Sequence, residues 1–328
     1  MIPAPPVFRV NMHTQPIDFQ PPAEEAAPCL LPARSAVFSE RADRFAALAN
    51  DHSLGDWLAF LGRLTRAQHD ALAALPILPL PDAATLQQAR NHGMPPLNAG
   101  SLPRPAAWRD VLRQLAMVVG HDAPPSARLS LDTLAAASDD RLEGLADTLL
   151  TGEPQAGDVA VLPFVAAALQ VVFTALASQL DASQLQPLDA PGVCPCCGSL
   201  PVASVVRLGA AINNLRYLHC SLCNSEWNVP RAICTACDTD QGVALHEVEG
   251  SKGAVRAETC DSCRSYLKIV YQEKDPRVDP VADDLATLAL DVLVDEVGYE
   301  RSGPNLFLIG AHRGYSCERH SHGSGDPG

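Results

Sequence analysis

The chain has 328 residues, 47% of them hydrophobic, which is enough for two or three domains with buried cores. Acidic residues outnumber basic ones by 38 to 24, and the net charge of −14 argues against general attraction to nucleic acid. The N-terminus lacks the pattern of a secretory signal, so we expect the eleven cysteines to lie in a reducing cytosol.

Residues 1–36 are rich in proline and show no usable periodicity, so we predict a flexible arm. Its lone cysteine, Cys29, is interpreted as a small residue without a ligand role. From residue 37 to 188, apolar residues recur at helical spacing, which predicts an α-helical N-terminal domain. Its expected helices span residues 41–50, 54–75, 85–90, 106–119, 130–150 and 159–177.

Residues 159–177 form the most apolar run of the chain, and two interpretations fit its length. A run of 19 residues reaches the lower range for a membrane span. Pro163, Gln170 and Thr174 interrupt this run, however, and no basic residues flank it. We therefore expect a buried central helix of the bundle and no membrane contact.

Four Cys-x-x-Cys turns, here called knuckles, are the strongest pattern in the sequence. A shift of 40 residues places the first four cysteines on the second four. Two knuckles supply the four thiolates of a tetrahedral zinc or iron site. The repeat favours sequential pairing of the knuckles over a cross-braced pairing of the first with the third. The predicted ligands are Cys194, Cys197, Cys220 and Cys223 in the first site, and Cys234, Cys237, Cys260 and Cys263 in the second.

Between the knuckles of each pair, β-prone residues flank a glycine-containing turn, which predicts one hairpin in each module. Residues 189–230 and 231–275 are therefore predicted to form two small rubredoxin-like or zinc-ribbon modules. Between residues 191 and 275 there are eight basic and nine acidic residues, which argues against nucleic acid as a partner. Gly198 follows its knuckle as in rubredoxin, whereas Asn224, Asp238 and Arg264 replace that glycine elsewhere.

Several residues in and near the knuckles have a structural and a functional interpretation. Cys196 lies inside the first knuckle and is interpreted as a spare thiol rather than a reactive one. His219 precedes Cys220, but four cysteines already complete the site. Arg216 and Arg256 each lie four residues before a knuckle, and we expect them to pair with knuckle carbonyls or acidic neighbours.

After the modules, residues 276–310 are predicted to form a C-terminal helix over residues 279–299 and a short extended closing segment. Residues 311–328 are predicted to be a disordered tail. The tail contains possible metal ligands, but we expect them to be solvated. These tail residues are His312, Cys317, His320 and His322.

The chain carries no phosphate-binding loop, no dinucleotide-binding glycine motif and no His-Glu-x-x-His motif. A closed site of four cysteines also leaves no open position on the metal for a substrate. We therefore expect a protein that is not an enzyme.

Four segments together resemble the formate dehydrogenase accessory protein family, FdhE. Residues 162–171 (LPFVAAALQV) resemble its signature helix, and residues 283–291 (DDLATLALD) are similar to its C-terminal helix. Residues 194–204 (CPCCGSLPVAS) and 215–220 (LRYLHC) resemble its first metal module. The resemblance covers about residues 37–310.

The resemblance implies a cytoplasmic maturation factor that binds the immature catalytic subunit of a formate dehydrogenase. It also implies that the eight paired cysteines hold metal, with iron the usual inference and zinc the alternative. A protein that delivers electrons or sulfur chemistry to the same client, through iron or Cys196, is the competing hypothesis. The sequence leaves a homodimer open.

Overall fold

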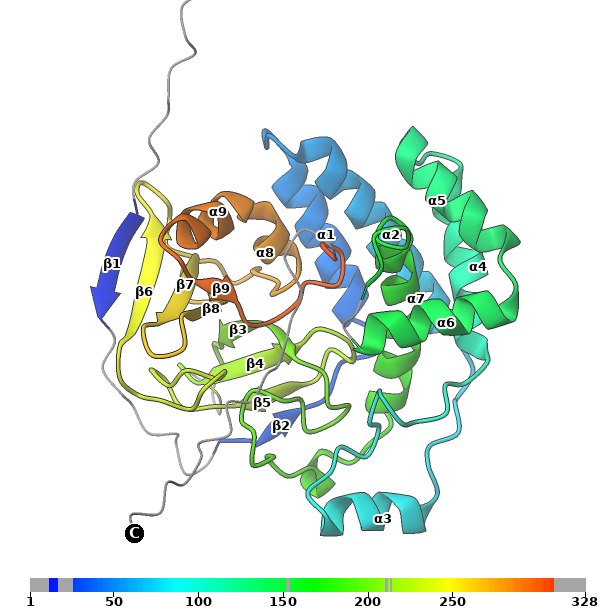
Figure 1. The fold of residues 1–328 in the computed structure, drawn as a ribbon, viewed down its shortest axis with the longest axis horizontal. Coiled ribbons are helices and arrows are strands. Elements are labelled where there is room, and N and C mark those ends of the chain that lie inside the picture. Colours follow the sequence, from blue (N-terminus) through cyan, green and yellow to red (C-terminus); the bar gives the residue numbers. More distant parts are fainter. Residues whose placement is uncertain (1–11, 17–25, 152–153, 210–211, 213, 310–328) are drawn as a thin grey trace, which may run out of the picture.

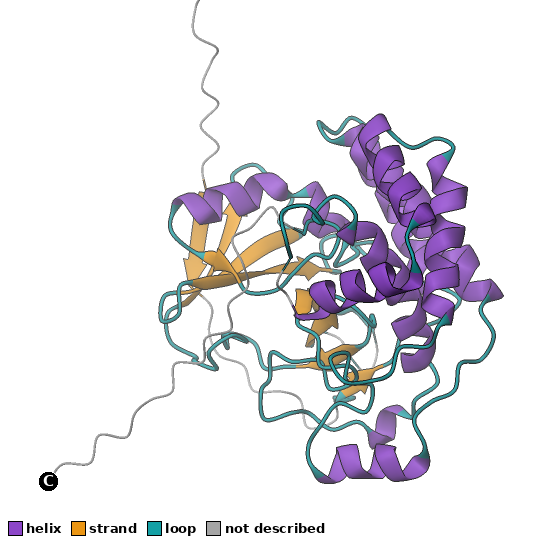
Figure 2. Cartoon of the chain, turned by 45° about the vertical axis from the view of Figure 1, so that its right-hand side comes forward, coloured by secondary structure: helices purple, strands orange, loops and turns teal. Residues whose placement is uncertain are grey.

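A computed structural model of the chain describes residues 12–16, 26–151, 154–209, 212 and 214–309. A helical N-terminal region is followed by a strand-rich region that contains two four-cysteine clusters, as the sequence predicts. The helices of the N-terminal region gather on one side of the molecule and most strands on the other, where the C-terminal helices lie over the sheet (Figure 1; Figure 2). The predicted tail, with its three histidines and one cysteine, lies outside the described residues.

The helical region has seven α-helices among the described residues, and a short 3-10 helix follows them. Their bounds are α1 (Val37–Ala49), α2 (Gly55–Ala74), α3 (Ala83–Asn91), α4 (Ala107–Gly120), α5 (Pro125–Ala136), α6 (Asp139–Thr151), α7 (Leu162–Ala177) and η1 (Ala182–Gln184). Where one helix was predicted over residues 130–150, the structure has two. Ser138 separates them, because its hydroxyl accepts a hydrogen bond from the Arg141 N–H in the first turn of α6.

Helix α7 forms the centre of the helical region, packed against α2, α4 and α6. All its side chains except Pro163 are buried, which the near-continuous apolar sequence explains. Among the described residues no helix is both long enough and apolar enough to cross a membrane. The buried-helix interpretation of this run is therefore the one that the structure supports.

In the part of the chain that the structure describes, nine strands form one sheet. They are β1 (Met12–Pro16), β2 (Cys29–Leu30), β3 (Pro201–Val206), β4 (Arg216–Cys220), β5 (Glu226–Asn228), β6 (Val243–Val248), β7 (Val255–Cys260), β8 (Ser265–Tyr271) and β9 (Glu300–Arg301). Both predicted hairpins form, as the antiparallel pairs β3–β4 and β6–β7. The N-terminal arm contributes β1, which pairs with β6, and β2, which pairs with β5.

The two modules share this sheet rather than standing apart. Strand β3 of the first module runs parallel to β8 of the second, with Ser204 opposite Ile269. A parallel pair between segments so far apart in sequence has no local signal, and the sequence analysis did not predict it. The modules are therefore joined through backbone hydrogen bonds as well as through the linker between them.

The predicted helix over residues 279–299 forms as two shorter helices, α8 (Ala282–Ala286) and α9 (Leu288–Glu296). The break lies at Thr287, whose hydroxyl donates to the Asp283 carbonyl. The buried Lys268 ammonium donates to the carbonyls of Asp284 and Thr287, at 2.8 and 3.1 Å. Both carbonyls at the break therefore accept a hydrogen bond from the Lys268 side chain. Residues 306–309 form turns instead of the predicted extended segment.

Candidate functional site

The structure groups the eight paired cysteines into two clusters, each of which contains two consecutive knuckles. This is the sequential arrangement that the 40-residue repeat favours. Within each cluster the four sulfur atoms lie within 4.8 Å of one another. The cysteines of the first cluster are all fully buried, whereas those of the second are buried at Cys234 and Cys260 and exposed at Cys237 and Cys263.

All four knuckles have the same backbone conformation at the residue that follows them. Gly198 has φ 81°, and Asn224, Asp238 and Arg264 have φ between 56° and 60°. The replacement of glycine after three of the four knuckles therefore changes the side chain but keeps the left-handed backbone conformation. Asn and Asp tolerate this left-handed region better than most residues, and the Arg264 guanidinium stacks 3.9 Å from the centre of the Tyr299 ring.

The sulfur geometry fits a tetrahedral metal ion. The Sγ–Sγ distances are 3.6 Å for Cys194–Cys223 and 3.4 Å for Cys197–Cys220. In the second cluster they are 3.6 Å for Cys234–Cys263 and 3.7 Å for Cys237–Cys260. Disulfide sulfurs lie about 2 Å apart, whereas metal–sulfur bonds of about 2.3 Å place tetrahedral thiolates nearly 4 Å apart. The donor set suits zinc and iron alike.

The helical region holds both knuckles of the first cluster. The N–H groups of Leu97 and Ala99 donate to the carbonyls of Cys196 and Cys197, both at 2.9 Å. From α7, the Gln170 amide donates to the Ser221 carbonyl at 2.7 Å. The Thr174 hydroxyl accepts from the Asn224 amide at 2.8 Å. The two polar residues of the apolar α7 therefore position the second knuckle.

Arg216 and Arg256 occupy equivalent positions of the repeat, and both pair with acidic neighbours, as predicted. Arg216 is buried and lies 2.5 Å from Glu258 of the second module. Its guanidinium also donates to the carbonyls of Pro230 and Ile233, the latter next to Cys234. Arg256 lies nearer the surface, 2.8 Å from Glu247.

Three further residues that the sequence analysis discussed are buried: Cys29, Cys196 and His219. Cys196 has no exposed surface, and the neighbouring Cys223 thiol, together with burial, raises the pKa of the Cys196 thiol. Burial raises the pKa of Cys29 to about 12. His219 is no ligand of the cluster; its Nδ1 lies 2.8 Å from the Glu226 carboxylate.

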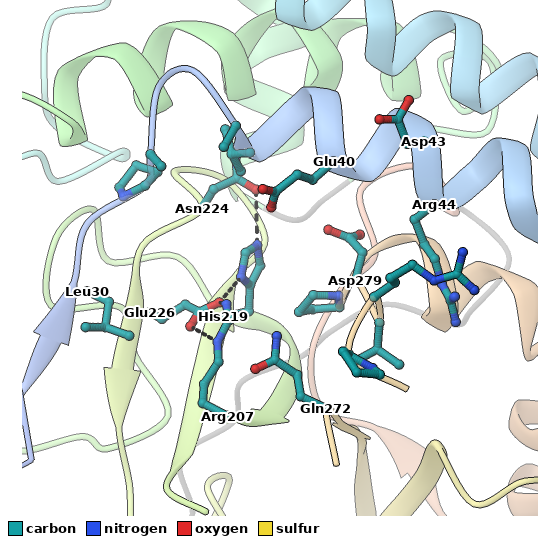
Figure 3. Close-up of a pocket in the computed structure, with 18 of the residues that line it drawn as sticks. Leu30, Glu40, Asp43, Arg44, Arg207, His219, Asn224, Glu226, Gln272 and Asp279 are labelled. Carbon is teal, nitrogen blue, oxygen red and sulfur yellow. Dashed lines mark hydrogen bonds and ion pairs between the residues drawn. The ribbon is translucent and has the colours of Figure 1, made fainter. Parts of the chain in front are cut away.

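A pocket of about 600 Å³ opens beside the first module, where it meets α1 and the segment after β2 (Figure 3). Sequence reasoning did not identify its residues, because they come from four separate segments. Its apolar wall contains Leu30, Leu31, Ala36, Val37 and Ala47, and its polar lining includes Glu40, Arg44, Arg207, His219, Asn224, Glu226, Gln272 and Asp279.

Most charged groups at the base of this pocket are already paired. Burial by itself would raise the pKa of Glu226, yet the Arg207 guanidinium and His219 lower it to about 2. The buried Arg41 joins three parts of the chain here, because it contacts Asp279, Asn224 and His219 at 3.0, 2.8 and 3.2 Å. The pocket therefore has a rigid polar floor beneath an apolar wall.

Comparison with known proteins matches most of the chain to one family. Models of the FdhE N-terminal, central and C-terminal domains match residues 26–190, 193–231 and 233–308. A protein named FdhE homolog from Serratia proteamaculans is 40% identical over 288 residues, which is 88% of this chain and 93% of the relative. The homolog from Edwardsiella ictaluri is 41% identical over 284 residues, with 86% and 92% covered.

A solved structure agrees with the sequence comparisons. The crystal structure of the FdhE protein from Pseudomonas aeruginosa is 36% identical to this chain and superposes with a TM-score of 0.78. The match covers 87% of this chain and 99% of the solved one.

Proposed function

Since the chain belongs to the FdhE family of formate dehydrogenase accessory proteins, we propose that it is a maturation factor that binds the immature catalytic subunit of a formate dehydrogenase. It performs no catalysis of its own and acts in the cytoplasm, where a reducing environment keeps its thiolate clusters from forming disulfides. The observation that carries the binding role is the pocket between α1 and the first module.

The client is held at this pocket, which combines surfaces from the helical region and from the first metal module. Its apolar wall can receive side chains that an incompletely folded polypeptide exposes, and the Glu40 carboxylate is an exposed polar group on α1. Arg41 and Arg44 tie α1 to the C-terminal segment through Asp279 and Asp283, so the wall is preorganised. The eight cysteines hold the two metal ions that keep the ribbon wall folded.

Two neighbouring alanines of α1 provide the test. Ala47 lines the pocket and Ala46 does not, and both are exposed on the same helix. Ala47→Phe should fill the pocket and weaken binding of the immature catalytic subunit about tenfold or more, measured by pull-down and titration calorimetry. Ala46→Phe adds the same bulk outside the pocket and should bind like the unmodified chain. Equal binding by both variants would contradict this assignment.

We propose iron as the metal in both clusters, following the family resemblance. Purified protein prepared without added metal should then show the visible absorption of ferric tetrathiolate, and elemental analysis should find iron. A colourless preparation containing zinc would contradict this choice while leaving the client-binding role intact. A reversible one-electron change of the bound iron that alters client activation would favour the electron-delivery role instead.

A further inference from the structure

The two four-cysteine clusters are equivalent in the repeat but opposite in their access to solvent. Within the knuckles of the first cluster, the residues between the cysteines are all buried: Pro195, Cys196, Ser221 and Leu222. At the equivalent positions of the second cluster, Thr235 is half-buried and Ala236, Asp261 and Ser262 are exposed. The same backbone motif therefore forms one enclosed site and one site with an open side.

The enclosed site is part of the main core of the protein. Its four cysteines pack in one hydrophobic cluster with α2, α4 and α7. Each of its knuckles is also hydrogen-bonded to the helical region, through Leu97 and Ala99 on one side and Gln170 on the other. A ligand that approaches this cluster would have to separate the module from the helices first.

The second cluster, which is the open site, packs in a smaller hydrophobic core than the first and has fewer residues shielding it from solvent. Of its four cysteines, Cys234 and Cys260 form a small buried hydrophobic cluster with Val243. The end of α9 lies along one side, where Arg264 donates to the Val297 carbonyl and Tyr299 contacts Asp261. Even so, Cys237 and Cys263 remain exposed. Each is the last cysteine of its knuckle.

We propose that the second cluster transfers its metal ion to thiol ligands from solution or from a partner protein while the chain stays folded. The first cluster does not release its metal ion in this way. This rests on the proposed metal-binding role of the eight cysteines. An incoming thiol replaces Cys263 or Cys237 and passes its proton to the displaced thiolate. Four thiolates still surround the ion, the total charge is unchanged and no electron is transferred. Repetition of the step at the remaining cysteines completes the transfer.

Metal release tests the proposal on the full chain. The protein is loaded with two zinc ions and mixed with excess glutathione and a chromogenic zinc chelator. We expect two phases of equal amplitude, one ion each, with rates that differ by at least about tenfold. In Cys263→Ser the slow phase should keep its rate, while the fast phase accelerates or is lost. A single phase releasing both ions would overturn the proposal.

Alkylation of the unmodified, zinc-loaded protein assigns the phases without any substitution. After brief exposure to N-ethylmaleimide and digestion, mass spectrometry should find the label on Cys237 and Cys263 before any cysteine of the first cluster. Label on Cys194 or Cys220 at the same rate would overturn the proposal. A chain that binds no metal at all would instead refute the metal-binding role on which the proposal rests, so the two failures are distinguishable.

Discussion

Replacing Arg216 by alanine should destabilise the chain far more than the same change at Arg256, although the two arginines are equivalent in the repeat. Arg216 is buried, with 1% of its side chain exposed, and it connects Glu258 and the Ile233 carbonyl to the first module. Arg256 pairs with Glu247 where both side chains are about one-fifth exposed. Replacing Arg256 removes an ion pair that contact with water already weakens.

The expected magnitude follows from what each substitution leaves behind. Without Arg216 the Glu258 carboxylate has no cationic partner in a buried position, and losing one partner of a buried pair costs about 3–5 kcal/mol. Losing a partly exposed pair costs about 1 kcal/mol or less. Substituting Glu258→Leu together with Arg216→Met should recover most of the loss, because no buried charge then remains unpaired.

The loss of stability in Arg216→Ala should also depend on pH. Burial raises the pKa of Glu258 and the Arg216 guanidinium opposes that rise, so Arg216→Ala raises this pKa further. Between the pKa of the unfolded state and the raised pKa, the folded chain binds more protons than the unfolded one. The stability of the variant therefore falls as pH rises through this window, and its deficit relative to the unmodified chain should shrink as pH is lowered through the raised pKa.

Urea unfolding followed by circular dichroism measures this deficit, with the free metal concentration held constant because bound metal adds to stability. Equal losses in Arg216→Ala and Arg256→Ala would refute the reasoning. A deficit that stayed constant from pH 8 down to the pKa of an unfolded glutamate would show that Glu258 does not carry the effect.

Three further predictions concern the metals, the helices and the pocket floor. Fully loaded protein should contain two metal ions per chain, and elemental analysis that finds one would exclude the two-site assignment. Because α7 buries its surface against other helices, most helical circular dichroism should survive removal of both metals; its complete loss would show that the helices depend on the modules. Glu226→Gln should cost about 3 kcal/mol, since the pKa of Glu226 falls from 4.5 to about 2 on folding. The stabilisation is present above pH 4.5 and is lost as pH falls towards 2. Urea unfolding should therefore show the full cost at neutral pH and a smaller cost as pH falls below 4.5, and a cost that did not shrink there would contradict this prediction.

Much of the organisation is determined locally and can be predicted from the sequence. The 40-residue repeat predicts which cysteines meet, because each knuckle closes within four residues and the spacing within each module is the same. Helical periodicity predicts α1, α2, α4 and α7 with small errors at their ends. The break at Thr287 was missed because the ammonium of Lys268, which donates to the Thr287 carbonyl there, comes from a strand 19 residues away in the sequence.

The tertiary structure decided how the modules are joined and which cluster is enclosed. The β3–β8 pair, the contact of Arg216 with Glu258 and the junction pocket each bring together residues that are distant along the chain. The exposure of the second cluster had a weak sequence signal, since Asp261 and Ser262 stand where the first cluster has Ser221 and Leu222. Burial itself depends on which surface packs against the helices, and only the assembled fold determines that.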